Sequence, residues 1–182
     1  MPIEIEKKYH LKDRKERDRV ASILKSSGAV FANEVFEENF LHKGGDLREK
    51  AAVLRLRKIA DTTILTYKEK VREDQDIKHR LEYETKVSDV DATEKIIQSL
   101  GFSLNVIYEK RRQTWHFGSV EIVLDELPFG HYMEIEGTAE AIEKAEKKLG
   151  FRELESESRG YPRLTIMYGT QVGEVYEARF ER

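Results

Sequence analysis

The sequence predicts an α+β fold in which eight antiparallel strands close into a β-barrel and helices pack outside it. Segments with a two-residue hydrophobic alternation dominate the chain, and helical segments interrupt them at three places. Charged residues also share one face of nearly every predicted strand. The chain has 182 residues, three prolines and no linker rich in Ser and Gly, so we expect one domain over residues 1–182.

Eight segments have the alternation of half-buried strands. Residues i, i+2 and i+4 of a strand share a face, so each segment places apolar side chains on one side and polar side chains on the other. The segments are Ile3–Leu11, Val35–Leu41, Val53–Ile59, Thr62–Glu69, Arg80–Val87, Asn105–Phe117, Ser119–Glu126 and Tyr132–Gly137. Eight strands are enough to close a small barrel.

Three segments have the features of amphipathic helices. Asp13–Ser27 places apolar residues on one face, Asp89–Leu100 opens with Asp residues suited to capping, and Thr138–Leu149 begins with a Thr cap. A glycine follows each segment, as is common just after the end of a helix. We also expect a short helix at Leu164–Tyr168 near the C-terminus.

The composition excludes several classes of function. Lys and Arg (32) nearly balance Asp and Glu (35), and the net charge of −3 does not attract a nucleic-acid backbone. The chain has no cysteine, so a bound metal would take oxygen or imidazole ligands. No apolar run is long enough to cross a bilayer, and the N-terminus has no apolar signal core. We therefore expect a cytoplasmic protein with neither a nucleic-acid nor a membrane partner.

Charged residues recur at alternate positions of the predicted strands. The residues that share a face are Glu4, Glu6 and Lys8; Arg55 and Arg57; Glu82, Glu84 and Lys86; Lys110 and Arg112; and Glu134 and Glu136. Considered strand by strand, these faces would be the solvated outside of a purely structural barrel. Considered together, apolar reverse faces packed under helices would turn the charged faces inward. Both signs of charge inside a barrel are costly unless a divalent metal and a polyphosphate neutralise them.

Short charged motifs follow one another in order over residues 3–165. They are Glu4-x-Glu6-x-Lys8, Leu54–Arg57, Leu65–Lys68, Arg80–Glu84, Glu109–Arg112, Val123–Glu126, Gly130 and Glu134–Glu136. This series resembles the CYTH superfamily, also called the triphosphate tunnel metalloenzymes. The stretch Asn39–Lys50 departs from the family pattern, so the resemblance does not predict which leaving group the protein recognises.

The resemblance implies an eight-stranded antiparallel tunnel and an enzyme that uses Mg²⁺ or Mn²⁺ to act on a nucleoside triphosphate or another triphosphate or polyphosphate. The chain length and the block Val120–Gly137 look most similar to the class IV adenylate cyclases, which convert ATP to cyclic AMP and pyrophosphate. A triphosphate hydrolase, such as a thiamine triphosphatase or an inorganic tri- or polyphosphatase, stays open as the alternative. A non-catalytic polyphosphate- or nucleotide-binding module also stays open, as does a homodimer as the assembly state.

The resemblance also implies roles for individual residues. The expected metal ligands are Glu4, Glu6, Glu134 and Glu136, with Glu84 and Asp125 as helpers. The expected substrate-binding residues are Lys8, Arg55, Arg57, Lys68, Arg80, Lys86, Lys110 and Arg112. Lys8 is also the candidate catalytic residue, as a general base. Arg111 neighbours Arg112 along the strand and should face the other way, so we exclude it.

Overall fold

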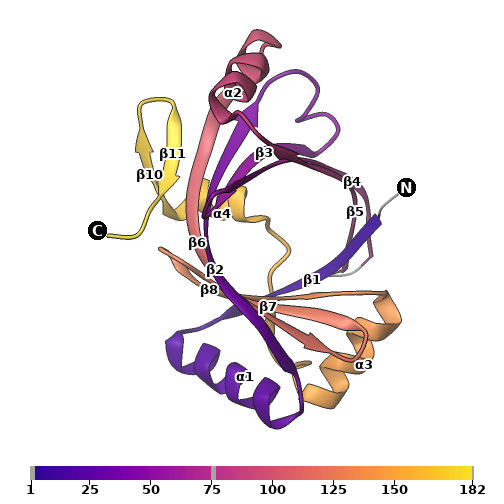
Figure 1. Cartoon of the computed structure of the whole chain (residues 1–182). Coiled ribbons are helices and arrows are strands. Elements are labelled where there is room, and N and C mark those ends of the chain that lie inside the picture. The colour runs from indigo at the N-terminus through magenta and orange to yellow at the C-terminus, as the bar shows by residue number, and fades with distance from the viewer. Residues whose placement is uncertain (1–2, 75–76, 182) are drawn as a thin grey trace.

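Eight consecutive strands pair in a closed antiparallel ring, as the alternation of their residues predicts (Figure 1). The strands are β1 (Ile3–Leu11), β2 (Val30–Lys43), β3 (Ala52–Ile59), β4 (Thr62–Asp74), β5 (Ile77–Val87), β6 (Ser103–Phe117), β7 (Val120–Leu127) and β8 (Gly130–Glu136). Their order around the ring is β6-β2-β3-β4-β5-β1-β8-β7, and β7 pairs again with β6. This computed structural model describes residues 3–74 and 77–181. The predicted barrel is confirmed.

Three strands are longer than the sequence predicts, and the other five agree within two residues at each end. β2 begins at Val30 rather than at Val35 because residues 30–34 extend beyond the core, where both of their faces are exposed and no apolar alternation is needed. β4 and β5 extend further toward each other than predicted, and β4 contains a register shift between Lys70 and Arg72. The extension of β5 adds the buried Lys78 to the barrel wall.

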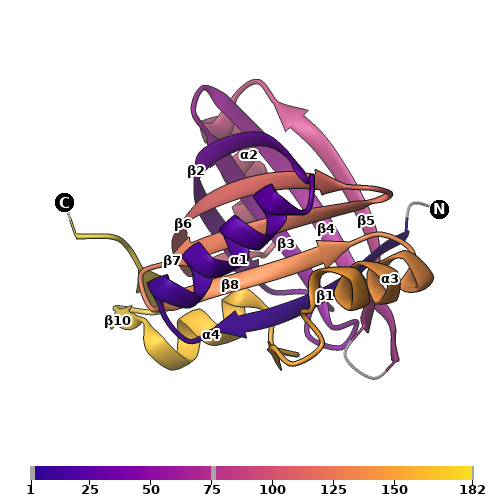
Figure 2. The same cartoon turned by 90° about the horizontal axis from the view of Figure 1, so that it is seen from below.

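Two helices cover the outer face of the barrel beside β1, β7 and β8 (Figures 1 and 2). They are α1 (Arg14–Ser26) and α3 (Ala139–Leu149), and their first turns are capped by the side chains of Asp13 and Thr138. Their apolar faces pack on those of the three strands, in a core where Leu24, Ile135 and Ile142 are almost fully buried. The apolar strand faces thus lie outside the ring, and the alternate faces point into it.

The third predicted helix, α2 (Val90–Ser99), lies beside β2 and buries little apolar surface. Ile97 is its one buried residue. The Asp89 carboxylate caps the start of the helix by accepting a hydrogen bond from the N–H group of Ala92. The His42 ring on β2 contacts the Glu94 carboxylate at 2.9 Å, which ties the helix to the barrel. Within the described residues, no helix is both long and apolar enough to cross a membrane.

The C-terminal segment crosses one end of the barrel. It contains β9 (Glu155–Ser156), α4 (Tyr161–Tyr168), β10 (Thr170–Val172) and β11 (Val175–Ala178). β9 pairs with the last part of β1, and β11 pairs in parallel with the first part of β6, so the segment spans the opening between them (Figure 1). α4 begins three residues earlier than predicted, and its buried Tyr161 and Leu164 pack against residues of β2, β6, β7 and β8.

We predict that Ile135→Ala lowers the free energy of unfolding by about 2–5 kcal/mol, because it leaves a cavity between β8 and the outer helices. Urea titration followed by circular dichroism measures the change. Ile96→Ala, on the exposed face of α2, is the matched control and should change stability by less than about 1 kcal/mol. Equal losses for the two variants would contradict the position of the core outside the ring.

Candidate active site

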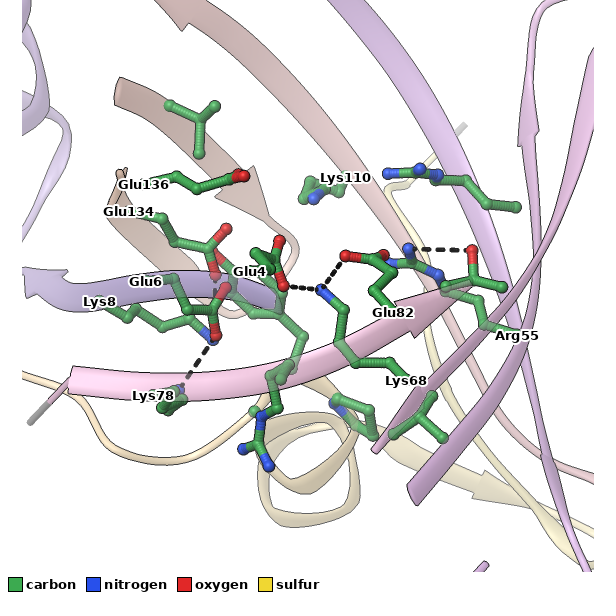
Figure 3. A pocket seen from close by; sticks show the side chains of 18 of the residues that line it. Glu4, Glu6, Lys8, Arg55, Lys68, Lys78, Glu82, Lys110, Glu134 and Glu136 are labelled. Carbon is green, nitrogen blue, oxygen red and sulfur yellow. Dashed lines mark hydrogen bonds and ion pairs between the residues drawn. The ribbon is translucent and has the colours of Figure 1, made fainter. Parts of the chain in front are cut away.

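A cavity of about 380 Å³ occupies the inside of the barrel. Among the described residues, eight cationic and seven anionic side chains line it, and seven of the eight barrel strands contribute at least one. The cations are Lys8, Arg55, Arg57, Lys68, Lys78, Arg80, Lys110 and Arg112, and the anions are Glu4, Glu6, Glu82, Glu84, Glu121, Glu134 and Glu136. A near balance of charge lets these groups pair with one another across the cavity (Figure 3).

The cations of β3 and β4 are held by carboxylates that lie one or two strands away around the ring. Arg57 donates to the Glu84 carboxylate over 2.9 Å, and the Thr66 hydroxyl donates to the same oxygen over 2.8 Å. Lys68 pairs with Glu4 from β1 and, at 3.2 Å, with Glu82 from β5 (Figure 3). These pairs cross three strands, so they orient the cations toward one volume rather than along separate strands.

Arg112 is fixed by a carboxylate behind the cavity wall. Its Nε and Nη2 atoms donate to the two oxygens of Asp125 over 2.8 and 2.6 Å, and Nη2 also donates to Glu134 over 2.7 Å. The Tyr161 hydroxyl donates to Asp125 over 2.7 Å. Asp125 is fully buried and does not line the cavity. It therefore orients Arg112, and its carboxylate does not reach the surface at which a metal would bind.

A second buried carboxylate supports the same group of cations. Glu37 on β2 is 1% exposed and lies 3.2 Å from Lys110 and 3.9 Å from Arg57. Burial alone would raise the pKa of Glu37, but Lys110, Arg112 and Arg57 together lower it to about 2. Glu37 therefore stays ionised and balances cations that burial would otherwise destabilise.

The carboxylates of β1, β7 and β8 gather on another side of the cavity. Glu6 and Lys8 of β1 stand opposite Glu136 and Glu134 of β8, and Glu121 of β7 stands opposite Glu136. Figure 3 shows the side chains of Glu4, Glu6, Glu134 and Glu136 directed toward a common volume. The sheet register thus brings together acidic residues that are more than a hundred positions apart in the chain.

These carboxylates differ in their preference for a proton. Burial, with repulsion from Glu4 and Glu121, raises the pKa of Glu136 to about 7. Burial also raises the pKa of Glu4, against the attraction of Lys68. For Glu134, burial raises the pKa, but Lys8, Arg112 and Lys110 outweigh it and hold the pKa well below its usual range. Unbalanced negative charge is therefore concentrated near Glu136.

This acidic side fits a divalent cation that is shared with a ligand. No three carboxylate or imidazole side chains in the described part of the chain converge closely enough to form a closed metal site. Mg²⁺ ordinarily takes one or two protein carboxylates and completes its shell with water and phosphate oxygens. A cation beside Glu4 and Glu136 would relieve the repulsion that raises the pKa of Glu136. The donor set therefore fits Mg²⁺ or Mn²⁺ together with a phosphate ligand.

Twelve of the fourteen residues that the sequence singled out line the cavity. The exceptions are Asp125, which lies behind the wall, and Lys86, which is exposed near the end of β5 and is not among the lining residues. Lys86 continues the alternation of Glu82 and Glu84, but the strand has left the cavity at that position. Arg111 faces outward and pairs with Glu126 at 3.3 Å, as the alternation predicts.

Several residues that line the cavity were not predicted from the sequence. Glu82 and Glu121 alternate with residues that it did select, so the same pattern could have included them. Lys78 alternates with Arg80, but it lies before the predicted start of the strand. Tyr161 comes from the C-terminal segment, and no strand pattern signals its approach to the cavity.

A closed antiparallel barrel with a charge-lined interior defines a tunnel-type fold, and the comparison with family models agrees. The model of the CYTH domain matches residues 2–162. The chain therefore belongs to the CYTH family. No curated protein matches the chain at a significant level.

Solved structures share this fold over nearly their whole length. The PH1012 protein of Pyrococcus horikoshii is 23% identical, with a TM-score of 0.76 over 88% of this chain and 98% of that chain. The PH1819 protein of the same organism is 26% identical, with a TM-score of 0.74 over 90% and 98%. HpAC1 from Hippeastrum, described as an adenylyl cyclase candidate with a dominant triphosphatase activity, is 17% identical, with a TM-score of 0.71 over 93% and 98%.

We predict that the metal-free protein loses stability as the pH rises from about 5 to 8. The pKa of Glu136 is higher in the folded chain than its ordinary value of 4.5, so the folded state binds the proton more tightly and loses that advantage as the pH passes about 7. Glu136→Gln should flatten this slope and melt at a higher temperature than wild type at pH 8. Thermal melts in EDTA at several pH values measure it, and identical slopes for the two proteins would refute the prediction.

Proposed function

We propose that this protein is a divalent-metal-dependent enzyme that acts on a triphosphate bound inside the barrel, with class IV adenylate cyclase as the nearest activity. The observation that carries the proposal is the cavity, where cations of β3, β4 and β6 face carboxylates of β1 and β8. A bound polyphosphate can pair with the cations, and a bound divalent cation can pair with the carboxylates. Both ligands together leave every charged group with a partner.

The basic residues of the cavity have the chemistry of a phosphate site. Arg55, Arg57 and Arg112 offer planar guanidinium groups that can donate two hydrogen bonds to phosphate oxygens, and the lysines act as point charges. Lys8 Nζ lies 3.2 Å from the Glu134 carboxylate, donates to the Arg159 carbonyl over 3.2 Å and lies over the Tyr161 ring. The carboxylate, the carbonyl oxygen and the aromatic ring are all groups that attract a charged hydrogen-bond donor. We therefore assign Lys8 to phosphate binding.

Catalysis in this proposal rests on positioning and on charge stabilisation. The Glu84 carboxylate holds Arg57, and the buried Asp125 carboxylate holds Arg112. The two arginines would fix the phosphate chain and stabilise charge on its oxygens in the transition state. Glu4 and Glu136, with Glu6 beside them, would hold Mg²⁺ or Mn²⁺, and the metal would neutralise phosphate charge. In a cyclase the ribose 3′-hydroxyl would be aligned with the α-phosphorus, and in a hydrolase water would be aligned with the terminal phosphorus.

A second hollow favours a substrate with an organic group. It has a volume of about 480 Å³ and adjoins the cavity at Arg57, Arg112 and Glu121, which line both. Its other lining residues are Ala32, Asn33, Val35, Glu37, Ile59, Thr62, Thr114 and His116. Among the described residues that line it, three are apolar and eight are polar or charged, so the hollow offers mainly hydrogen-bonding groups to an organic group next to the phosphate chain. This position supports a nucleoside attached to the triphosphate more than an inorganic chain.

Triphosphate hydrolysis is the second candidate. HpAC1, which shares the fold, is described as having a dominant triphosphatase activity. The same placement of a triphosphate would serve either reaction, because the two differ in which nucleophile is aligned and not in how the phosphates are held.

We predict that the protein turns over ATP in the presence of Mg²⁺ or Mn²⁺ and that EDTA abolishes the turnover. A panel of ATP, thiamine triphosphate and tripolyphosphate, scored for cyclic AMP, pyrophosphate and orthophosphate, identifies the reaction. Cyclic AMP with pyrophosphate would establish the cyclase, whereas orthophosphate without cyclic AMP would establish the hydrolase. Binding of these compounds without any turnover would instead identify a non-catalytic module.

We predict that Glu4→Gln lowers kcat/KM by roughly 100-fold or more, because it removes a carboxylate that faces both Lys68 and the acidic side of the cavity. Glu153→Gln, an equivalent change at an exposed position outside the barrel, is the control and should leave kcat/KM unchanged. Full turnover by a folded Glu4→Gln protein would refute the role of the acidic residues.

A further inference from the structure

A tyrosine of the C-terminal segment forms part of the cavity wall. Tyr161 is the first residue of α4, is 6% exposed and lines the cavity. Its ring packs between the rings of Tyr108 and Tyr132, with centroid distances of 6.0 and 5.5 Å. Leu164, one turn later in α4, is fully buried in the same cluster. This packing leaves the ring little freedom, so its hydroxyl group is held at a fixed point beside the cavity.

The Tyr161 hydroxyl donates a hydrogen bond to a carboxylate behind the cavity wall. It lies 2.7 Å from Oδ2 of Asp125, and the Nη2 atom of Arg112 lies 2.6 Å from the same oxygen. The Nζ atom of Lys110 makes a third, longer contact with this oxygen at 3.4 Å. Asp125 is 0% exposed, so its carboxylate depends on these protein donors rather than on solvent.

The orientation of the Asp125 carboxylate sets the orientation of the Arg112 guanidinium group. Arg112 donates from Nε to Oδ1 and from Nη2 to Oδ2, so the two planar groups turn together. The last torsion angle of an Asp side chain has a broad minimum, so the carboxylate does not select one orientation by itself. A hydroxyl group on a fixed ring does select one. Without it, Oδ2 can turn toward Lys110 and away from Arg112.

Such a turn would reach the cavity through Arg112. This arginine lines both the cavity and the second hollow, and its Nη2 atom also donates to Glu134 over 2.7 Å. A rotation of the guanidinium plane would weaken the contact with Glu134 and change which nitrogen atoms face a ligand. The Tyr161 hydroxyl therefore influences the cavity through two intervening groups that touch each other.

We infer that Tyr161 is a positioning residue, whose hydroxyl group fixes the Asp125 carboxylate and thereby holds the Arg112 guanidinium group in the orientation that binds the triphosphate. The inference rests on the proposed function, and it assigns no contact with phosphate to Tyr161 itself. The C-terminal segment then supplies part of the geometry of the site, although none of the charged strand motifs includes it.

Tyr161→Phe isolates the hydroxyl group, because phenylalanine keeps the packed ring, whose centre lies 3.7 Å from Lys8 Nζ. In the ligand-free protein, ¹H–¹⁵N spectra of arginine Nε–H groups report on Arg112 directly, and Arg112→Lys assigns its signal by removing it. We expect the Arg112 Nε–H group to exchange with water at least about ten-fold faster in Tyr161→Phe than in wild type. Tyr83→Phe, at an exposed position of β5, is the control and should leave the rate unchanged. An unchanged rate in a folded Tyr161→Phe protein would overturn the inference.

A second measurement needs no variant. In wild-type protein labelled with ¹³C at the tyrosine ring carbon that bears the hydroxyl group, we expect Tyr161 to give two separate signals in an equal mixture of H₂O and D₂O. Separate signals mean that the hydroxyl proton exchanges slowly, as expected when it is bonded to a buried carboxylate. A single averaged signal would overturn the inference even if Tyr161→Phe does not fold.

Turnover separates a positioning role from a general loss of structure. We expect Tyr161→Phe to lower kcat/KM by about five- to thirty-fold in the wild-type background. In an Arg112→Lys background the same change should lower kcat/KM by less than about two-fold, because the group that Tyr161 positions is already absent. Equal losses in the two backgrounds would show a merely structural effect and reject the positioning role.

Failure of the inference is distinct from failure of the proposed function. Wild-type protein that turns over a triphosphate, with unchanged exchange of Arg112 in Tyr161→Phe, would keep the function and reject the positioning role. Wild-type protein that turns over no triphosphate would reject the function, while the exchange of Arg112 in the ligand-free protein would still decide whether Tyr161 orients it.

Discussion

Buried charges need partners, and this requirement governs the inside of the barrel. Eight cations and seven anions point into one cavity, where each charge would be destabilised by the loss of water. Pairs across strands offset that loss, as Lys68 shows by contacting both Glu4 and Glu82. Removing one member of such a pair leaves the other buried alone, which costs more than the pair itself contributes. The charges of the lumen are therefore stable only as mutually dependent pairs. The same side chains are positioned to bind a triphosphate together with a divalent cation.

The other parts of the fold follow from directing the charged faces inward. Apolar strand faces must then lie outside, and α1 and α3 bury them on the side of β1, β7 and β8. Two carboxylates behind the wall, Asp125 and Glu37, keep Arg112 and Lys110 in place without occupying the cavity. The C-terminal segment covers one end, so the cavity is asymmetric along its axis.

The fold could be predicted from the sequence because strand alternation and charge alternation agree in almost every strand. The same rule correctly excluded Arg111, which faces outward. The alternation rule gave the wrong position for residues near the ends of strands. Lys86 keeps the alternation but lies beyond the cavity, and Lys78 precedes the predicted strand but belongs to the wall. Asp125 has the right alternation but is fully buried behind Arg112, a position that depends on the packing of Tyr161. No local pattern predicts which end of the barrel the C-terminal segment covers.

The proposed function requires above all that a triphosphate and a divalent cation occupy the lumen together. A crystal structure of the protein with Mn²⁺ and the bis(methylene) analogue of ATP, with anomalous data collected at the manganese edge, tests this claim directly. We predict an anomalous peak beside Glu4 and Glu136 and phosphate density in contact with Arg57 and Arg112 inside the barrel. Phosphate density confined to the outer surface, with no manganese peak near those carboxylates, would contradict it.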